Sequence, residues 1–241
     1  MSERLDFFPI EESRDSTLDD LIERIGLYCN NKAVEPPTDI INSLLIRKYR
    51  AGLACILIGD QWGNIIKETK ATSSVLRLDG EVVSRLVDTA SIYLEATMNI
   101  GYSFYDLFAQ IINCSILENH FSKRKCSFTE VTKELEKKPD LKTICTAIKK
   151  SSCKQYFFDY MNTTKHRELI DTKWSIKSVI GIKYNGPVLC AFEFDGVHHP
   201  NKNLDDVRKL IDESFKELLE FLASILSYYE SGTIDQMRTT P

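Results

Sequence analysis

The stretch 102-YSFYDLFAQIINCSIL-117 decides the fold that the sequence predicts. Its apolar residues would occupy nearly every side of a helix instead of forming a single stripe. A helix of this kind is typical of the centre of a protein, because each of its sides needs an apolar partner. We therefore expect a central helix over residues 103–119, with other helices packed around it.

Further helices are expected along most of the chain. After Asp79, apolar residues recur at steps of three and four, which predicts a helix with one buried stripe. Gly101 follows this segment and predicts a turn before the central helix. The other predicted helices lie at 16–30, 38 to about 70, 128–137, 141–149, 152–167 and from Asn203 onward, with fraying after Gly232.

One passage predicts strands. Segments 175–184 and 188–194 are rich in Ile, Val and Phe, and they flank Asn185-Gly186. Asn-Gly between two such runs favours a hairpin turn, because both residues tolerate a positive φ. The sequence thus predicts a mostly α fold, a single helical domain over 1–241 with one β-hairpin at about 175–194.

The composition is that of an ordinary globular protein, with 43% hydrophobic and 27% charged residues in 241. No apolar run approaches the roughly 18–20 residues that span a bilayer. The acidic start MSERLDFFPIEE lacks the basic-then-apolar order of a signal peptide. We expect a cytoplasmic protein. The seven cysteines are scattered without a CxxC pair, so we expect them reduced, with no metal site and no cofactor.

Basic residues are concentrated between Ser122 and Lys183. This segment holds 15 Lys and Arg against 7 Asp and Glu, a net charge of +8 in a chain whose net charge is −4. Such a segment attracts a polyanion if its charges share one face. The other interpretation is an ordinary solvated helix surface, and the sequence leaves both open.

The segment 160-YMNTTKHRELID-171 carries the candidate site residues Asn162, Lys165, His166 and Arg167. On a helix, Asn162 and His166 would share a face because they are four residues apart. His166 could exchange a proton near neutral pH, Asn162 could hold a phosphate oxygen, and Lys165 and Arg167 could attract the RNA backbone. The competing interpretation is a solvent-facing polar turn, which composition alone favours.

Three other histidines are weaker candidates. His198 and His199 are adjacent and would need further ligands to hold a metal, so we interpret them as loop residues. His120 and Arg124 could lie on one helical turn.

The order of elements resembles the HEPN superfamily of helical bundles, in particular bacterial domains with an N-x-x-K-H-R helix. YSFYDLFAQIINCSIL resembles their core helix and YFFDYMNTTKHRELI their site helix, and the similarity spans roughly 80–229. The resemblance implies a HEPN-like antiparallel bundle over 79–231, preceded by N-terminal helices in 1–78. It also implies a homodimer that pairs through the site helices.

The family's ribonuclease motif is an Arg, a polar residue and a His, with four to six residues between the Arg and the His. On this chain His166 takes the His position, Asn162 the polar position and Met161 the Arg position. Methionine cannot stabilise charge on a phosphate, and losing such a contact commonly costs several kcal/mol of transition-state stabilisation. The resemblance therefore implies an RNA- or nucleotide-associated protein of bacterial defence or toxin–antitoxin character, with an impaired ribonuclease site.

Two alternatives stay open. One is a non-catalytic protein-interaction module, and the other is an active metal-independent ribonuclease that uses His166 with Arg167 or with an Arg of the partner subunit. The apolar stripe Tyr156, Phe157, Tyr160 and Met161 also predicts that Met161 faces the core or a dimer interface. Asn162 and His166 would then share a more polar groove.

Overall fold

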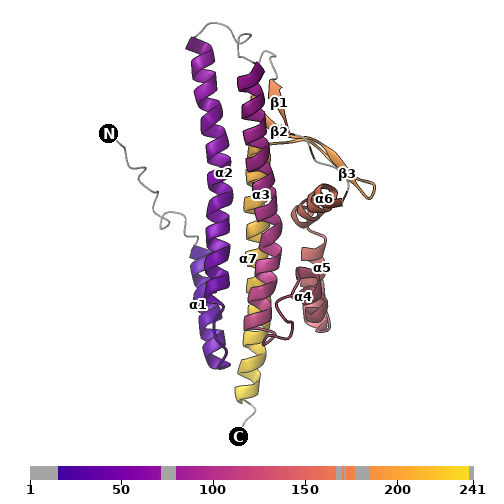
Figure 1. Ribbon diagram of the computed structural model, residues 1–241. Helices are drawn as coiled ribbons and strands as arrows, with labels where there is room; N and C mark the ends of the chain where they lie inside the picture. The colour runs from indigo at the N-terminus through magenta and orange to yellow at the C-terminus, as the bar shows by residue number, and fades with distance from the viewer. Residues whose placement is uncertain (1–15, 72–79, 167–169, 171, 177–184, 239–241) are drawn as a thin grey trace, which may run out of the picture.

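The computed structural model describes residues 16–71, 80–166, 170, 172–176 and 185–238, and most of them are helical (Figure 1). The helices are α1 Ser16–Asn31, α2 Thr38–Ala71, α3 Gly80–Ser115, α4 Phe128–Leu135, α5 Pro139–Lys149, α6 Ser152–His166 and α7 Leu204–Arg238. The strands are β1 Thr172–Ile176, β2 Asn185–Leu189, β3 Phe192–Phe194, β4 Val197–His199 and β5 Lys202–Asn203. The predicted mostly α fold, with a small antiparallel sheet before the last helix, is confirmed.

The long helices α2, α3 and α7 run side by side, and α3 contacts most of the other helices (Figure 1). It packs against α1, α2, α4, α6 and α7, and it also contacts β1 and β2. Its side chains Phe104, Tyr105 and Phe108 are completely buried. The prediction of a central helix from an all-round apolar sequence is therefore confirmed, although this helix ends at Ser115.

Gly101 does not form the predicted turn, because α3 continues straight through it. The residue is buried, and a Cβ atom there would collide with the ring of Phe157 on α6 and lie 2.9 Å from Cδ1 of Ile211 on α7. Glycine allows three helices to approach one another closely at this point. Gly101 thus allows close packing and does not reverse the chain.

The predicted turn at Asn185-Gly186 is also wrong. Both residues lie in β2, where Asn185 pairs with Ile176 and Gly186 with Ser175 of β1. The tight turn occurs between β3 and β4, at Asp195-Gly196, with φ values of 49° and 80°. Two consecutive positive φ angles are what a type I′ hairpin turn requires. Residues 177–184 of the predicted first strand lie outside the described residues.

The last helix is fixed at its start and along its length. Asn203 Oδ1 accepts a hydrogen bond from the Asp206 N–H at 2.9 Å, and Asp206 Oδ2 accepts one from the Asn203 N–H at 3.1 Å. This reciprocal cap satisfies two backbone donors at the start of α7. Arg24 of α1 forms a 2.7 Å ion pair with Glu230, which joins the first helix to the last. The helix continues to Arg238, so the prediction of fraying after Gly232 is wrong.

Replacing Gly101 with Ala should destabilise the protein by about 1–3 kcal/mol, because the added methyl group overpacks a buried contact. This loss should appear although Ala favours a helix by about 1 kcal/mol over Gly. Urea unfolding measures the change in the free energy of unfolding. The matched control is Gly26→Ala in α1, where a Cβ would meet nothing within 4 Å and the variant should gain about 0.5–1 kcal/mol. A stabilised Gly101→Ala variant would contradict the packing argument.

Candidate functional site

Helix α6 carries the predicted site and is oriented by its buried side. That side is made of Cys153, Tyr156, Phe157, Asp159, Tyr160, Met161 and Thr163. The prediction that Met161 faces the core is confirmed, since only 6% of the residue is exposed. The position that corresponds to the arginine of the HEPN motif therefore points into the bundle.

The other predicted site residues lie toward solvent. Asn162 is half-buried, while Lys165 and His166 in the last turn of α6 are exposed. Asn162 and His166 thus lie outside the apolar side of α6, and the polar groove around them stays a prediction. Arg167 lies outside the described residues.

A surface of two adjacent rings, each with a cation beside it, lies where α6 packs against α3. Lys154 Nζ is 4.2 Å from the ring centroid of Phe158, and Lys165 Nζ is 5.1 Å from that of Tyr102. The two ring centroids are 4.8 Å apart, so the four side chains form one continuous array. We call Lys154, Phe158, Tyr102 and Lys165 the aromatic–basic face. Sequence reasoning found Lys165 but missed the other three. Tyr102 could not be placed beside α6, because it belongs to a helix that is distant in the sequence.

Charge around this face is predominantly positive. Burial lowers the pKa of Lys154, with nearby Lys149 acting in the same direction. Asp106 lies one helical turn beyond Tyr102, and burial raises the pKa of its carboxyl group. Lys165, the backbone N–H of Phe128 and Arg47 act in the opposite direction and favour the carboxylate. One acidic group thus interacts with cations from α2 and α6 at the edge of the face.

A buried polar pair that the sequence did not reveal lies on α6. His199 Nε2 is 2.8 Å from Asp159 Oδ2, and Gln155 Nε2 donates to both oxygens of the same carboxylate, at 2.8 and 2.7 Å. The His199 ring stacks on Phe192 at 4.5 Å and meets the edge of Tyr156 at 5.1 Å. The interpretation of His199 as a loop residue is therefore wrong, because it lies in β4 and is 7% exposed.

The Asp159–His199 pair attaches the β3–β4 hairpin to α6. Asp159 is only 2% exposed, and its buried carboxylate is paired with both His199 and Gln155. The hydroxyl of Tyr156 beside them is buried without a hydrogen-bond partner among the described residues. With neither partner open to solvent, the pair serves to position α6 and is not placed to meet a substrate.

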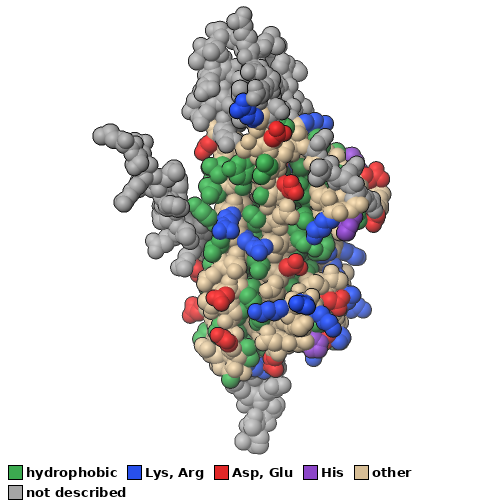
Figure 2. All heavy atoms as spheres, viewed as in Figure 1, with side chains coloured by type: hydrophobic (Ala, Val, Ile, Leu, Met, Phe, Trp, Pro, Cys, Tyr) green, Lys and Arg blue, Asp and Glu red, His purple; other side chains and the backbone are tan. Residues whose placement is uncertain are grey.

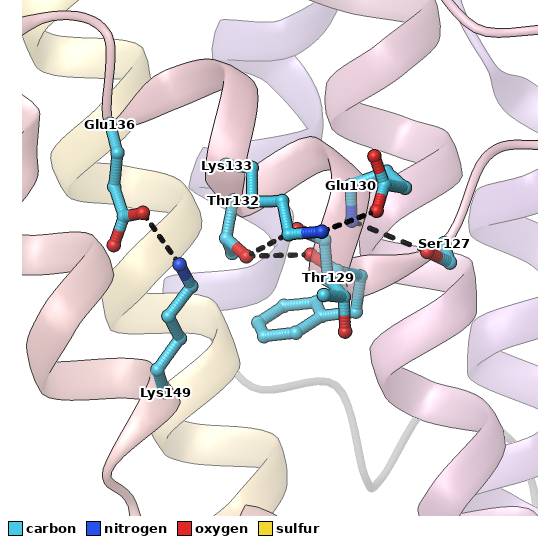
Figure 3. Close-up of polar contacts among 8 residues, drawn as sticks. Ser127, Thr129, Glu130, Thr132, Lys133, Glu136 and Lys149 are labelled. Atoms are coloured by element: carbon cyan, nitrogen blue, oxygen red, sulfur yellow. Dashed lines mark hydrogen bonds and ion pairs between the residues drawn. The ribbon is translucent and has the colours of Figure 1, made fainter.

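Part of the positive charge on α4, on α5 and on the turn between them is offset locally (Figure 3). Lys133 bonds Glu130 at 2.8 Å, Lys149 bonds Glu136 at 2.6 Å, and Lys137 bonds Glu134 at 2.6 Å. The interpretation of a solvated helix surface therefore holds for these lysines. Lys154 and Lys165 of α6 lie instead next to the half-buried rings of Phe158 and Tyr102.

The weaker candidates do not form sites. His120 lies 3.7 Å from Glu134, in the connection between α3 and α4, so His120 and Arg124 do not share a helical turn.

All seven cysteines are free, and burial raises the pKa of Cys55 and of Cys145 to about 11. Among the described residues, no group of three or more His, Cys, Asp or Glu side chains could hold a metal ion. No helix within the described residues is both long enough and apolar enough to cross a membrane.

Comparison with known proteins adds no relative. No protein-family model matches the chain, and no curated protein and no solved structure matches it. The resemblance of residues 79–231 to HEPN domains therefore stays a prediction that rests on the residues themselves.

Changing Asp159 to Leu should lower the free energy of unfolding by about 3 kcal/mol, because it leaves a buried imidazole without its partner. The double variant Asp159→Leu/His199→Phe should recover much of this loss, since two apolar side chains leave no buried polar group without a hydrogen-bond partner. Urea unfolding of the single and double variants measures the coupling between the two positions. Additive losses would show that the pair is not a unit.

Proposed function

We propose that the protein binds single-stranded RNA through the aromatic–basic face and does not cleave it. The observation that carries the proposal is the array of Lys154, Phe158, Tyr102 and Lys165 across α3 and α6. Proteins that bind single strands combine cations that follow the backbone with rings on which bases stack. Asn162, between Phe158 and Lys165 on α6, adds an amide that can bond a phosphate or a base edge.

The energies favour an exchange of partners on this face. An exposed contact between a lysine and a ring contributes about 0.5–1 kcal/mol. A base stacked on a ring contributes about 1–3 kcal/mol. Exposed side chains change rotamer rapidly, so Lys165 can move to a phosphate while the rings accept bases. The contacts within the free protein are therefore weak enough to be replaced by contacts with RNA.

The burial of Met161 supports binding without catalysis. In the HEPN motif the residue at this position stabilises charge on the reacting phosphate, and here it is a methionine turned into the core. His166 could still move a proton, but proton transfer alone leaves the developing charge unsupported. Within the resemblance, the protein fits a role in bacterial defence or a toxin–antitoxin system as an RNA-binding member with an impaired site.

RNA affinity should depend on the lysines and the rings in different ways. Lys154→Ala/Lys165→Ala should weaken binding of a single-stranded oligonucleotide and reduce the slope of log K against log salt by about 1.4, or about 0.7 per lost phosphate contact. Phe158→Ala should weaken binding about tenfold or more at an unchanged salt slope, because a base loses its stacking partner. Titration by fluorescence anisotropy at several salt concentrations measures both effects.

The matched control for this titration is Lys142→Ala, an exposed lysine of α5 that lies outside the face. It removes the same charge and should change the affinity little. Equal weakening by Lys142→Ala would indicate nonspecific attraction. No binding even at low salt would refute the RNA proposal and favour the protein-interaction module.

Cleavage of the same RNA should be undetectable, and His166→Ala should leave binding nearly unchanged. Met161→Arg, which the motif alone suggests as a way to restore activity, should instead destabilise the fold, because a guanidinium would be buried in an apolar core. Gel assays of RNA cleavage and urea unfolding measure the two outcomes. Efficient cleavage that His166→Ala abolishes would establish the active ribonuclease in place of this proposal.

A further inference from the structure

Helix α2 exposes an apolar line on the side opposite the core. Ile46, Leu53 and Ile56 are 48%, 37% and 52% exposed, and half-buried Tyr49 lies between the first two. Their steps of three and four residues are the a and d positions of a heptad repeat. We call Ile46, Tyr49, Leu53 and Ile56 the α2 seam. Figure 2 shows hydrophobic side chains gathered over the middle of α2.

The seam does not belong to the core of its own subunit. On the same helix, Ala51, Cys55 and Ile58 are buried and point the opposite way. Leu57 adds a further exposed aliphatic group beside the seam. A heptad line of this kind on a long helix is the pattern through which two helices pair by fitting side chains between one another.

We propose that the α2 seam binds a second copy of this chain, with α2 antiparallel to α2 of the partner subunit. The polar residues at the ends of the seam favour this occupant and this direction. Asn42 precedes the seam by one turn and Asp60 follows it by one turn, and both are exposed. A parallel pair would place Asp60 against Asp60 of the partner subunit, where like charges repel.

Antiparallel pairing makes the same residues complementary. In the register that keeps the whole seam in contact, Ile46 faces Ile56 of the partner subunit and Tyr49 faces Leu53 of the partner subunit. The Asn42 amide can then donate to the Asp60 carboxylate of the partner subunit at each end. The layers in the middle of the interface are then apolar, and the layers at its two ends are polar. Both copies use the same surface, as a two-fold interface requires.

The site helix is less suited to this role, although the HEPN resemblance implies pairing through it. The apolar side of α6, with Tyr156, Phe157, Tyr160 and Met161, is already buried within its own subunit. Its outer side carries Lys154, Lys165 and His166, which would repel their counterparts in a second copy when charged. Dimerisation through α2 instead leaves the aromatic–basic face of α6 free.

Sedimentation velocity on the full chain tests the interface. The protein should be a dimer at micromolar concentration, and Leu53→Lys or Ile56→Lys should raise the dimer dissociation constant at least a hundredfold. The matched control is Leu27→Lys, which alters an exposed aliphatic residue of α1, 57% exposed, and should leave the dimer intact. Far-UV circular dichroism confirms that each variant is folded. A monomeric parent protein, or a dimer that survives both seam variants, would overturn the proposal.

Cysteine crosslinking tests the direction and register. An Ile46→Cys protein mixed with an Ile56→Cys protein should form a disulfide-linked pair under mild oxidation, because the two positions face each other. Ile46→Cys protein alone should not crosslink, since the two copies of residue 46 would be about 15 Å apart along the helix axis. The parent protein, whose cysteines are buried or half-buried, is the background control. Self-crosslinking of Ile46→Cys would show a parallel pair and refute the antiparallel interface.

Discussion

The close approach of three helices at Gly101 is the constraint on which the rest of the structure depends. α3 has no side chain at this point, and Phe157 of α6 and Ile211 of α7 occupy the space. Because Phe157 is completely buried, this contact sets the distance of α6 from α3 and limits its rotation. A side chain at position 101 would push both neighbours outward together.

The rotation of α6 in turn decides its chemistry. Asp159 must reach His199 on the β3–β4 hairpin, and Phe157 must reach Gly101, so these residues define the inner side of the helix. Met161 then lies inward, while Lys154, Phe158 and Lys165 lie toward Tyr102 and solvent. One packing arrangement thus withdraws the position of the motif arginine from solvent and creates the aromatic–basic face. In the proposed function, the absence of catalysis and the presence of a binding surface would have the same physical origin.

Periodicity predicted the helices and the central position of α3, because apolar spacing reports burial directly. It could not assign the glycines, since a missing side chain serves equally for a turn, a strand pairing or a close helix contact. Asp195-Gly196 forms a turn, Asn185-Gly186 takes part in strand pairing, and Gly101 allows a close helix contact. The Asp159–His199 pair was hidden for another reason. Its partners are 40 residues apart, and each is ordinary in its local sequence.

The α2 seam shows a further limit of sequence patterns. Ile41, Leu44, Leu53, Ile56 and Leu57 all fit a helical period, yet Ile41 and Leu44 are buried and the other three are exposed. Apolar residues around more than half of a helix indicate two partners, and the sequence does not say which one belongs to the same subunit.

If both proposals hold, the second partner of α2 would affect RNA binding. A two-fold pair joined through α2 would carry two aromatic–basic faces on one rigid body. Two faces on one strand act through effective concentration, so modest affinity at each becomes strong binding only for an RNA long enough to reach both. The proposed RNA-binding face would gain selectivity for strand length in this way. The apolar seam would then hold the two aromatic–basic faces at a fixed separation, with α2 and α3 of each subunit as the rigid spacer between its face and the interface.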